Sequence, residues 1–337
     1  MKPKSFAVAR ALAVCALIAA LAAAALAQDK DKNKAPQVSK GEQEAMMKVQ
    51  SAADPAAKIK AAEEFIKKYP KSTNRAGVVT HVIGDISNVP DAAQKTTLLE
   101  SAMTVFKEPA DADIIAPALL NAYIAANRFD DVFSFTDKAL ARNPNDVATL
   151  TQVTIIGANQ AKQRNAKYVA QSQQYGAKAI QIIESGNKPA GMTDESWKEY
   201  QTRWLPQLYQ VTGLLSMMTG NNSEAKTRLE KASTLDANDP VTFYLLGSLL
   251  NDDYQKMAEG YQKQVAGPMK DQMLKDAQAK MDEIIDMWAR AIALAQGNAQ
   301  YQSFADQLRP ELEGYYKYRH AGSTKGLDEL IAKYKKP

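Results

Sequence analysis

The sequence predicts an all-α fold, a right-handed α-solenoid of helix–turn–helix repeats with one elongated helical hairpin. Two prolines, Pro206 and Pro240, lie 34 residues apart, and two glycines, Gly213 and Gly247, keep the same spacing. A fixed period of this length is typical of stacked helix pairs. From Gly41 onward apolar residues recur at helical spacing, and no stretch alternates apolar and polar residues as a strand would.

The repeating residues follow a known pattern of bulky, glycine and alanine positions. In the unit that begins at Pro206, the matching residues are Tyr209, Gly213, Gly220, Ala225, Leu229 and Ala232, and the departures are Thr212, Ser216 and Ala237. An earlier unit fits through Leu119, Tyr123, Ala139, Leu140 and Pro144, and a later one through Phe243, Leu246, Gly247, Ile284, Trp288 and Ala291. These residues resemble the tetratricopeptide repeat family. The resemblance implies a scaffold whose first helices line a groove for proteins or peptides.

The first 27 residues are typical of a secretory signal peptide. Basic residues come first, an apolar run follows, and Ala25-Leu26-Ala27 has the form of a cleavage site. The alternatives are a retained membrane anchor and a lipidated Cys15. The apolar run is short for a membrane span, and Val14 is bulky for lipoprotein cleavage. We therefore expect the mature chain to begin at Gln28 and to be periplasmic or secreted.

The composition of residues 28–40 differs from that of the rest. This stretch is polar and rich in Lys and Asp, which predicts a disordered linker. The remaining residues, 41–337, are predicted to form one tetratricopeptide-like solenoid domain. Solenoids of that length can form a single domain, because each repeat packs mainly on its neighbours.

The charge and cysteine content after signal removal exclude several classes of function. The chain would then carry 39 basic and 38 acidic residues and no cysteine. Disulfides and cysteine-ligated metals are excluded on this basis. A near-neutral balance gives no reason to expect binding to nucleic acid or to a membrane surface. We also expect no transmembrane span after signal removal, and the oligomeric state is not indicated.

Start signals and apolar spacing place the individual helices. Up to the central loop they are expected at residues 42–53, 55–68, 73–86, 91–107, 112–126, 129–142, 147–163 and 166–185. Gly186 to Gly191 is expected to be a loop, and Thr193 can cap the next helix. Pro206 then either kinks that helix or starts a new one. Helices at 299–317 and 325–335 are expected to end the array.

One unit departs from the regular period. Ile284 and Trp288 match the second helix of the last repeat only if about 25 residues are inserted in the turn before them. Apolar residues keep helical spacing through the insertion. The sequence therefore predicts a lengthened helix pair that turns at Ala266-Gly267-Pro268. Its distal half, 254–280, is predicted to project and to contact a partner, since surplus methionine and tyrosine would leave an apolar patch.

Motifs for catalysis or metal binding are not found. The two histidines, His81 and His320, lack partners at metal-site spacing. Acidic pairs such as Asp252-Asp253 are far more common on helix surfaces than in acid–base catalysis. We therefore expect a protein that is not an enzyme and has no cofactor and no metal.

The resemblance also implies which residues bind a partner. The groove-facing positions of the three units, together with apolar residues of the hairpin, are Asn121, Ile124, Gln207, Gln210, Leu214, Met217, Met218, Tyr244, Ser248, Asn251, Met257, Tyr261 and Met273. Amides and apolar groups suit an extended peptide or a partner helix. The alternative is a cell-envelope accessory module that binds carbohydrate through the tyrosine-rich stretch 315–319. Partner identity is not indicated.

Overall fold

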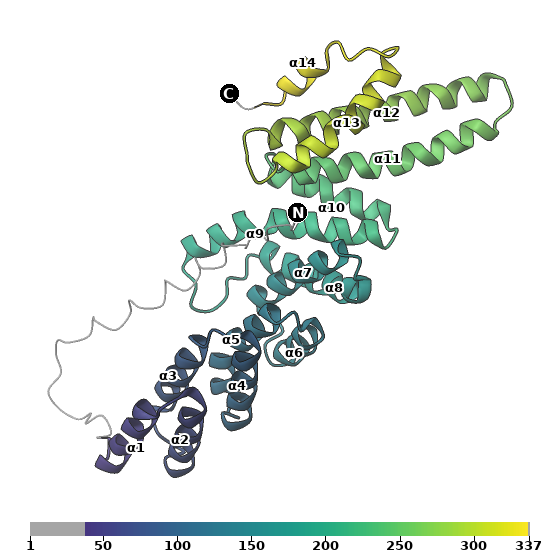
Figure 1. Ribbon diagram of the computed structural model, residues 1–337. Coiled ribbons are helices and arrows are strands. Elements are labelled where there is room, and N and C mark those ends of the chain that lie inside the picture. Colours follow the sequence, from purple (N-terminus) through teal and green to yellow (C-terminus); the bar gives the residue numbers. More distant parts are fainter. Residues whose placement is uncertain (1–37, 336–337) are drawn as a thin grey trace. The chain divides into compact units, whose positions relative to one another are not determined.

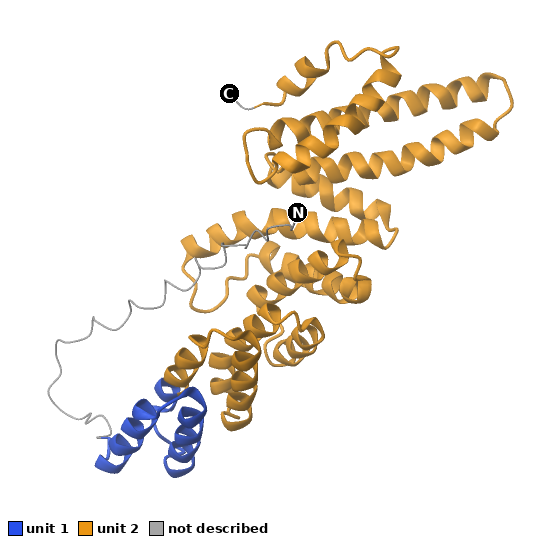
Figure 2. Ribbon diagram, in the orientation of Figure 1, with its two compact units in different colours: residues 1–78 blue, residues 79–337 orange. Residues whose placement is uncertain are grey.

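The computed structural model describes residues 38–335, so the predicted signal peptide and most of the predicted linker lie outside the described residues. The described chain forms fourteen α-helices and one short 3₁₀ helix, and it contains no strand (Figure 1). The prediction of an all-α array of helix pairs is confirmed. The chain divides into two compact units at Val78 and Val79 (Figure 2), and each is described in turn. The single domain at 41–337 stays a prediction.

The helices follow one another with short connections. Their bounds are α1 (Lys40–Ser51), α2 (Pro55–Lys68), α3 (Arg75–Ser87), α4 (Ala92–Val105), α5 (Pro109–Ala125), α6 (Phe129–Arg142), α7 (Val147–Lys162), η1 (Ala166–Tyr168), α8 (Val169–Glu184), α9 (Asp194–Met218), α10 (Asn222–Leu235), α11 (Pro240–Lys263), α12 (Pro268–Ala295), α13 (Gln302–Arg319) and α14 (Leu327–Ala332).

The first unit is built on the pair α1 and α2. Asp54 caps α2, since its carboxylate accepts a hydrogen bond from the backbone N–H of Ala57 at 2.8 Å. The two helices pack against each other, and Val49 of α1 and Phe65 of α2 are buried. Helices of this length depend on such tertiary packing, because isolated short helices are marginal in water.

In the second unit, α9 and α10 show how a regular pair is held together. Helix α9 packs on α10 and also on α7 and α8 of the preceding pair. At Gly213 the two helices come so close that an added Cβ would lie 2.8 Å from the Leu229 side chain. Real Cβ atoms do not approach other atoms that closely, so glycine is required here.

The next pair, α11 and α12, is the predicted long hairpin. A Cβ at Gly247 would lie 2.4 Å from the Trp288 ring, so Gly247 meets Trp288 as Gly213 meets Leu229. The register with an insertion of about 25 residues is therefore confirmed. The helices turn between Lys263 and Pro268, where the turn was predicted, and their far ends extend beyond α10 and α13 (Figure 1).

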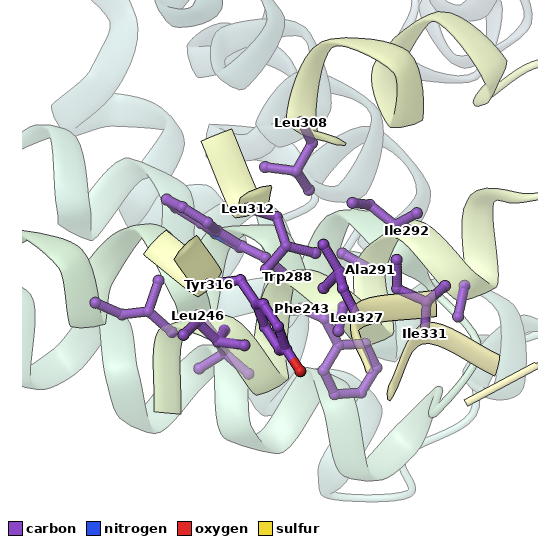
Figure 3. Packing of buried hydrophobic residues seen from close by; sticks show 14 of the residues in the cluster. Phe243, Leu246, Trp288, Ala291, Ile292, Leu308, Leu312, Tyr316, Leu327 and Ile331 are labelled. Atoms are coloured by element: carbon purple, nitrogen blue, oxygen red, sulfur yellow. The ribbon is translucent and has the colours of Figure 1, made fainter. Parts of the chain in front are cut away.

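The base of this hairpin carries an extensive cluster of buried apolar side chains (Figure 3). Phe243 and Leu246 from α11 and Trp288 from α12 belong to it. Helix α10 adds Leu229, and helices α13 and α14 add Leu308, Leu312, Tyr316, Leu327 and Ile331. These two helices cover the last pair, as predicted.

One of the two alternatives at Pro206 is wrong. No helix starts there, because α9 is continuous from Asp194 to Met218 and contains Pro206. Thr193 caps the helix as expected, accepting a hydrogen bond from the N–H of Ser196 at 3.1 Å. A proline inside a helix removes one backbone hydrogen bond. Trp197 and Leu208, on either side of Pro206, are buried.

Candidate binding surface

Two clefts open between successive first helices of the second unit. The first has a volume of about 410 Å³ and lies between α5 and α7, with the end of α6 as its floor. Asn121, a predicted binding residue, lines it and accepts a hydrogen bond from Gln152 Nε2 at 3.1 Å. Asp113, Arg142 and Asp146 supply its charged groups.

The second cleft is the counterpart of the first, between α9 and α11. Its volume is about 650 Å³, and its floor is the end of α10 and the loop that follows. Two predicted residues, Gln207 and Gln210, line it. Gln207 is exposed, whereas Gln210 donates hydrogen bonds to Asp239 and, at 2.9 Å, to Thr242 Oγ1. Gln210 therefore joins α9 to α11 as well as facing the cleft.

The two clefts share the same chemistry. Each contains one arginine, two aspartates and three amide side chains. In the first cleft these are Arg142, Asp113, Asp146, Asn121, Asn143 and Gln152, and in the second they are Arg203, Asp236, Asp239, Gln207, Gln210 and Asn238. The sides are lined with small or apolar groups that include proline. Each cleft thus has one negative charge in excess and several groups that both donate and accept hydrogen bonds.

One aspartate of each cleft is fixed in place by helix capping. Asp146 accepts hydrogen bonds from the N–H and, at 2.6 Å, the hydroxyl of Thr149. Asp239 accepts hydrogen bonds from the N–H and, at 2.5 Å, the hydroxyl of Thr242. These bonds stabilise the first turns of α7 and α11 and hold the carboxylates at the cleft rim. Nearby, burial followed by the charges of Asp239 and Asp236 raises the pKa of Tyr301, which also lines the second cleft.

The predicted residues of α9 beyond the second cleft divide between core and surface. Leu214 and Met217 are half-buried and pack against the apolar cluster of the long hairpin. Met218 is 44% exposed. Ile124, on α5, is half-buried. Of these four residues, only Met218 presents a large free apolar surface.

Helix α13 packs against the stretch of α11 that was predicted to face the groove. Tyr244 makes an edge-on contact with Phe304 at 5.3 Å between ring centroids. Asn251 accepts a hydrogen bond from the Tyr315 hydroxyl. Ser248 donates to the carbonyl of Tyr244 at 2.9 Å. These three side chains are half-buried and already engaged within the fold.

The hairpin residues proposed for binding lie mostly between its two arms. Met257, Tyr261 and Met273 are all half-buried, and the Met273 methyl group lies 3.2 Å from the place of a Cβ on Gly260. The exposed apolar side chains of the hairpin are instead Val265, 78% exposed, and Met269, 66% exposed. Both are near the turn. The predicted apolar surplus is thus confined to the end of the hairpin.

The tyrosine-rich stretch is largely used for packing. Tyr315 lies edge-on to Trp288, with 5.2 Å between ring centroids. Tyr316 is buried, and its hydroxyl donates to the carbonyl of Lys325 at 2.9 Å. Arg319 makes two hydrogen bonds of 2.8 Å with Asp282. Only Tyr318, 69% exposed, presents a free ring in this stretch.

Sequence reasoning missed the charged residues of the clefts. Arg142 comes from the end of a second helix and Asp236 from the loop after one, whereas the family pattern assigns binding to first helices. The sequence did contain a signal for the clefts. Each cleft contains an aspartate followed three residues later by a threonine, Asp146 with Thr149 and Asp239 with Thr242. That spacing is typical of a helix N-cap at the start of a first helix.

Within residues 38–335, no group of three or more His, Cys, Asp and Glu side chains could hold a metal ion. No helix of the same part of the chain combines the length and apolar character needed to cross a membrane.

No protein-family model and no curated protein matches this chain. Similar solved structures include a tetratricopeptide repeat protein from Parabacteroides merdae, 12% identical with a TM-score of 0.38, which matches over 87% of this chain and 98% of its own. Another is Pseudomonas aeruginosa pilF, 17% identical with a TM-score of 0.35, over 87% of this chain and all of its own. At such low identities and TM-scores, these similarities carry no argument about function. The tetratricopeptide-like architecture is shown by the helix pairs of this chain itself.

Proposed function

We propose that this protein is a non-catalytic exported scaffold that binds an extended segment of a partner protein in the two clefts. The observation that carries this proposal is the recurrence of the same side-chain chemistry in two clefts at equivalent places in the array. Two equivalent clefts suit a segment that passes from one first helix to the next. A single active site would not need the same set of side chains in two separate clefts.

The side chains of the clefts suggest what the segment offers. Amide groups can donate to and accept from the backbone of an extended peptide. The excess carboxylate in each cleft favours lysine or arginine side chains on the partner. The rims are fixed by the capping bonds of Asp146 and Asp239, so little ordering is needed when a segment binds.

Site-specific photo-crosslinking in the organism that makes the protein tests this function. A photoreactive residue at exposed Gln207 or Asp113 should capture the same partner, because one segment would contact both clefts. Exposed Lys231, on α10 and outside the clefts, is the matched control position. Capture of a shared partner from both cleft positions but not from Lys231 supports the proposal. Equal capture from all three positions would contradict it.

Export is part of the proposal and is tested separately. It is supported by the basic start, the apolar run and Ala25-Leu26-Ala27. N-terminal sequencing of the protein from its native cells should return Gln28 as the first residue. Recovery of Met1, or of a lipid-modified Cys15, would disprove this part.

A shortened hairpin separates binding in the clefts from binding by the hairpin. Because Met281 is buried in the core cluster, the deletion must stop short of it. Replacing residues 258–275 by a short flexible loop removes the distal arms and leaves the base intact. Crosslinking from Gln207 should then persist. Its loss in a folded variant would assign binding to the hairpin.

The carbohydrate alternative has less support. Tyr315 and Tyr316 are packed within the fold, and Tyr318 is the exposed ring of that stretch. Sedimentation with cell-wall polysaccharide, compared between the parent and Tyr318→Ala, tests it. Polysaccharide binding that is lost in Tyr318→Ala would support the carbohydrate-binding alternative.

A further inference from the structure

The end of the long hairpin combines exposed apolar side chains with lysines. We call residues 261–275 the hairpin tip; it holds the end of α11, the turn and the start of α12. Val265 and Met269 are among the most exposed large apolar side chains of the described residues, and they lie four positions apart in this tip. Lysines accompany them at positions 263, 270 and 275.

Charge is distributed unevenly along the hairpin. The tip carries three lysines and one aspartate, a net charge of +2. The adjoining stem, 252–260 and 276–280, carries two lysines and four acidic residues, a net charge of −2. The near-neutral balance of the whole chain conceals this segregation. Because the tip is positively charged and the stem is negatively charged, the hairpin should contact a negative surface with its tip.

The geometry of the tip suits a shallow contact. Tyr261 lies behind the turn, and Lys270 Nζ is placed 4.8 Å from the centre of its ring. The turn itself exposes Val265 and Ala266, while Gly267 adopts a φ of 150° that permits the sharp change of direction. The arms on either side extend past α10 and α13, so the tip is free to meet a broad surface (Figure 1).

We propose that the hairpin tip contacts an anionic phospholipid surface end-on. Val265 and Met269 would enter the boundary between headgroups and acyl chains, and the lysines would lie among the lipid phosphates. Apolar side chains flanked by lysines are the composition that binds such an interface. The acidic stem would be repelled, which limits penetration to the tip. No helix crosses the bilayer in this arrangement, so the contact is weak and reversible.

A lipid surface fits these groups better than a protein pocket does. Val265 and Met269 are exposed at the tip beside the ammonium groups of Lys263 and Lys275, which stand on flexible stems, and the exposed Asp271 is the one acidic group among residues 261–275. A soft, uniformly charged surface needs no shape complementarity from its ligand. Contact with an acidic protein is the competing occupant, and the experiment below distinguishes the two.

The test uses purified chain from Gln28 to Pro337, which contains every described residue and omits the apolar run of residues 11–26 that would itself bind lipid. This chain has no cysteine, so Val265→Cys can carry a single environment-sensitive dye. Tyr318→Cys, at a similarly exposed position outside the tip, is the matched control. Each labelled protein is mixed with phosphatidylethanolamine–phosphatidylglycerol vesicles or with vesicles of phosphatidylcholine alone.

The dye at position 265 should shift to the blue with the anionic vesicles and not with phosphatidylcholine, and the dye at position 318 should not shift. Lys263→Glu with Lys275→Glu should weaken vesicle co-flotation at least about tenfold, since each basic residue near an anionic surface contributes to binding. The double variant Lys198→Glu with Lys231→Glu makes the same charge change elsewhere and should have little effect.

Three results would overturn the proposal. The first is no dye response at position 265 with anionic vesicles. The second is an equal response at positions 265 and 318, which would mean general adsorption. The third is a response at position 265 that requires an acidic protein and not lipid, which would assign the tip to a protein partner.

Discussion

The pairs α9–α10 and α11–α12 share the same glycine contact but differ in how far their helices extend beyond it. In the first, Gly213 faces Leu229 across a regular pair. In the second, Gly247 faces Trp288, although the two are separated by the length of an inserted hairpin. The base of each pair is therefore the same structural unit. The inserted residues lengthen both arms and leave the contact at the base unchanged.

This difference shows how a repeat array can gain a new surface. Each pair is held by its own glycine contact and by its neighbours, so residues added at the far end of a pair do not disturb the core. The base of α11–α12 is buried with α13 and α14, whereas its tip exposes Val265 and Met269. The base of the hairpin thus stabilises the fold, and its opposite end is exposed for contact with another surface.

The largest expected effect comes from filling the two glycine contacts. Gly213→Leu and Gly247→Leu should each lower the free energy of unfolding by about 1–3 kcal/mol through overpacking. Gly247→Leu should cost more, because an added Cβ would meet the rigid Trp288 ring at 2.4 Å, against 2.8 Å to the flexible Leu229. Urea unfolding of both variants measures this, with Gly314→Leu as a control because nothing lies within 4 Å of its Cβ position.

If both glycine variants unfold at the same urea concentration as the parent, the repeat register is wrong. If Gly213→Leu is the more damaging of the two, the comparison between the pairs needs to be revised.

Alkaline pH should weaken both regions through the same kind of bond. Tyr209, on α9, donates to Glu184 at 2.6 Å, and Tyr334, after α14, donates to Asp286 on α12. Burial, followed by these hydrogen bonds, raises the pKa of both tyrosines from 10.0 to about 12. A raised pKa in the folded state means stability that is full below pH 10 and lost as the pH rises through about 12.

Melting temperatures measured from pH 9 to 12, a window set by the ordinary tyrosine pKa of about 10, should therefore fall. Tyr209→Phe and Tyr334→Phe should each reduce this fall, whereas Tyr318→Phe, at an exposed position, should leave it unchanged. A fall of undiminished size in the double Phe variant would mean that other groups cause it.

Surface ion pairs should have the smallest effect in both regions. Arg319 and Asp282 join α13 to α12, and Arg228 and Glu224 lie on α10 at 2.6 Å. All four side chains retain solvent contact, and such pairs contribute about 0–1 kcal/mol. Arg319→Gln and Arg228→Gln should thus shift the urea midpoint only slightly, and less at high salt. A large loss from Arg319→Gln would show that α13 is held mainly by that pair.

Much of the fold could be predicted from the sequence, because it depends on spacing. The 34-residue period identified the pairs, and the positions of Ile284 and Trp288 identified the insertion. Strong helix signals also located the turn before Pro268. The sequence alone could not decide whether residues 194–218 form one helix or two, since a proline can lie inside a helix or at the start of a new one.

The binding surface was less predictable. The pattern indicates which positions of a first helix face a groove, but it does not show what lies against them. Helix α13 lacks the repeat signature, and yet Phe304 and Tyr315 contact Tyr244 and Asn251. The arginines of the clefts escaped notice for a similar reason, since Arg142 is at the end of a second helix and Arg203 precedes the recognised unit.

Amide hydrogen exchange along α11 and α12 tests the contrast between base and tip most directly. Buried residues of the base, such as Phe243, Leu246 and Trp288, belong to the core cluster, so amides around them should exchange slowly. Amides of residues 258–275 should exchange much faster, because the distal arms are covered only by each other. Uniformly slow exchange from base to tip in the isolated protein would contradict the account, because it would show that the tip is buried like the core.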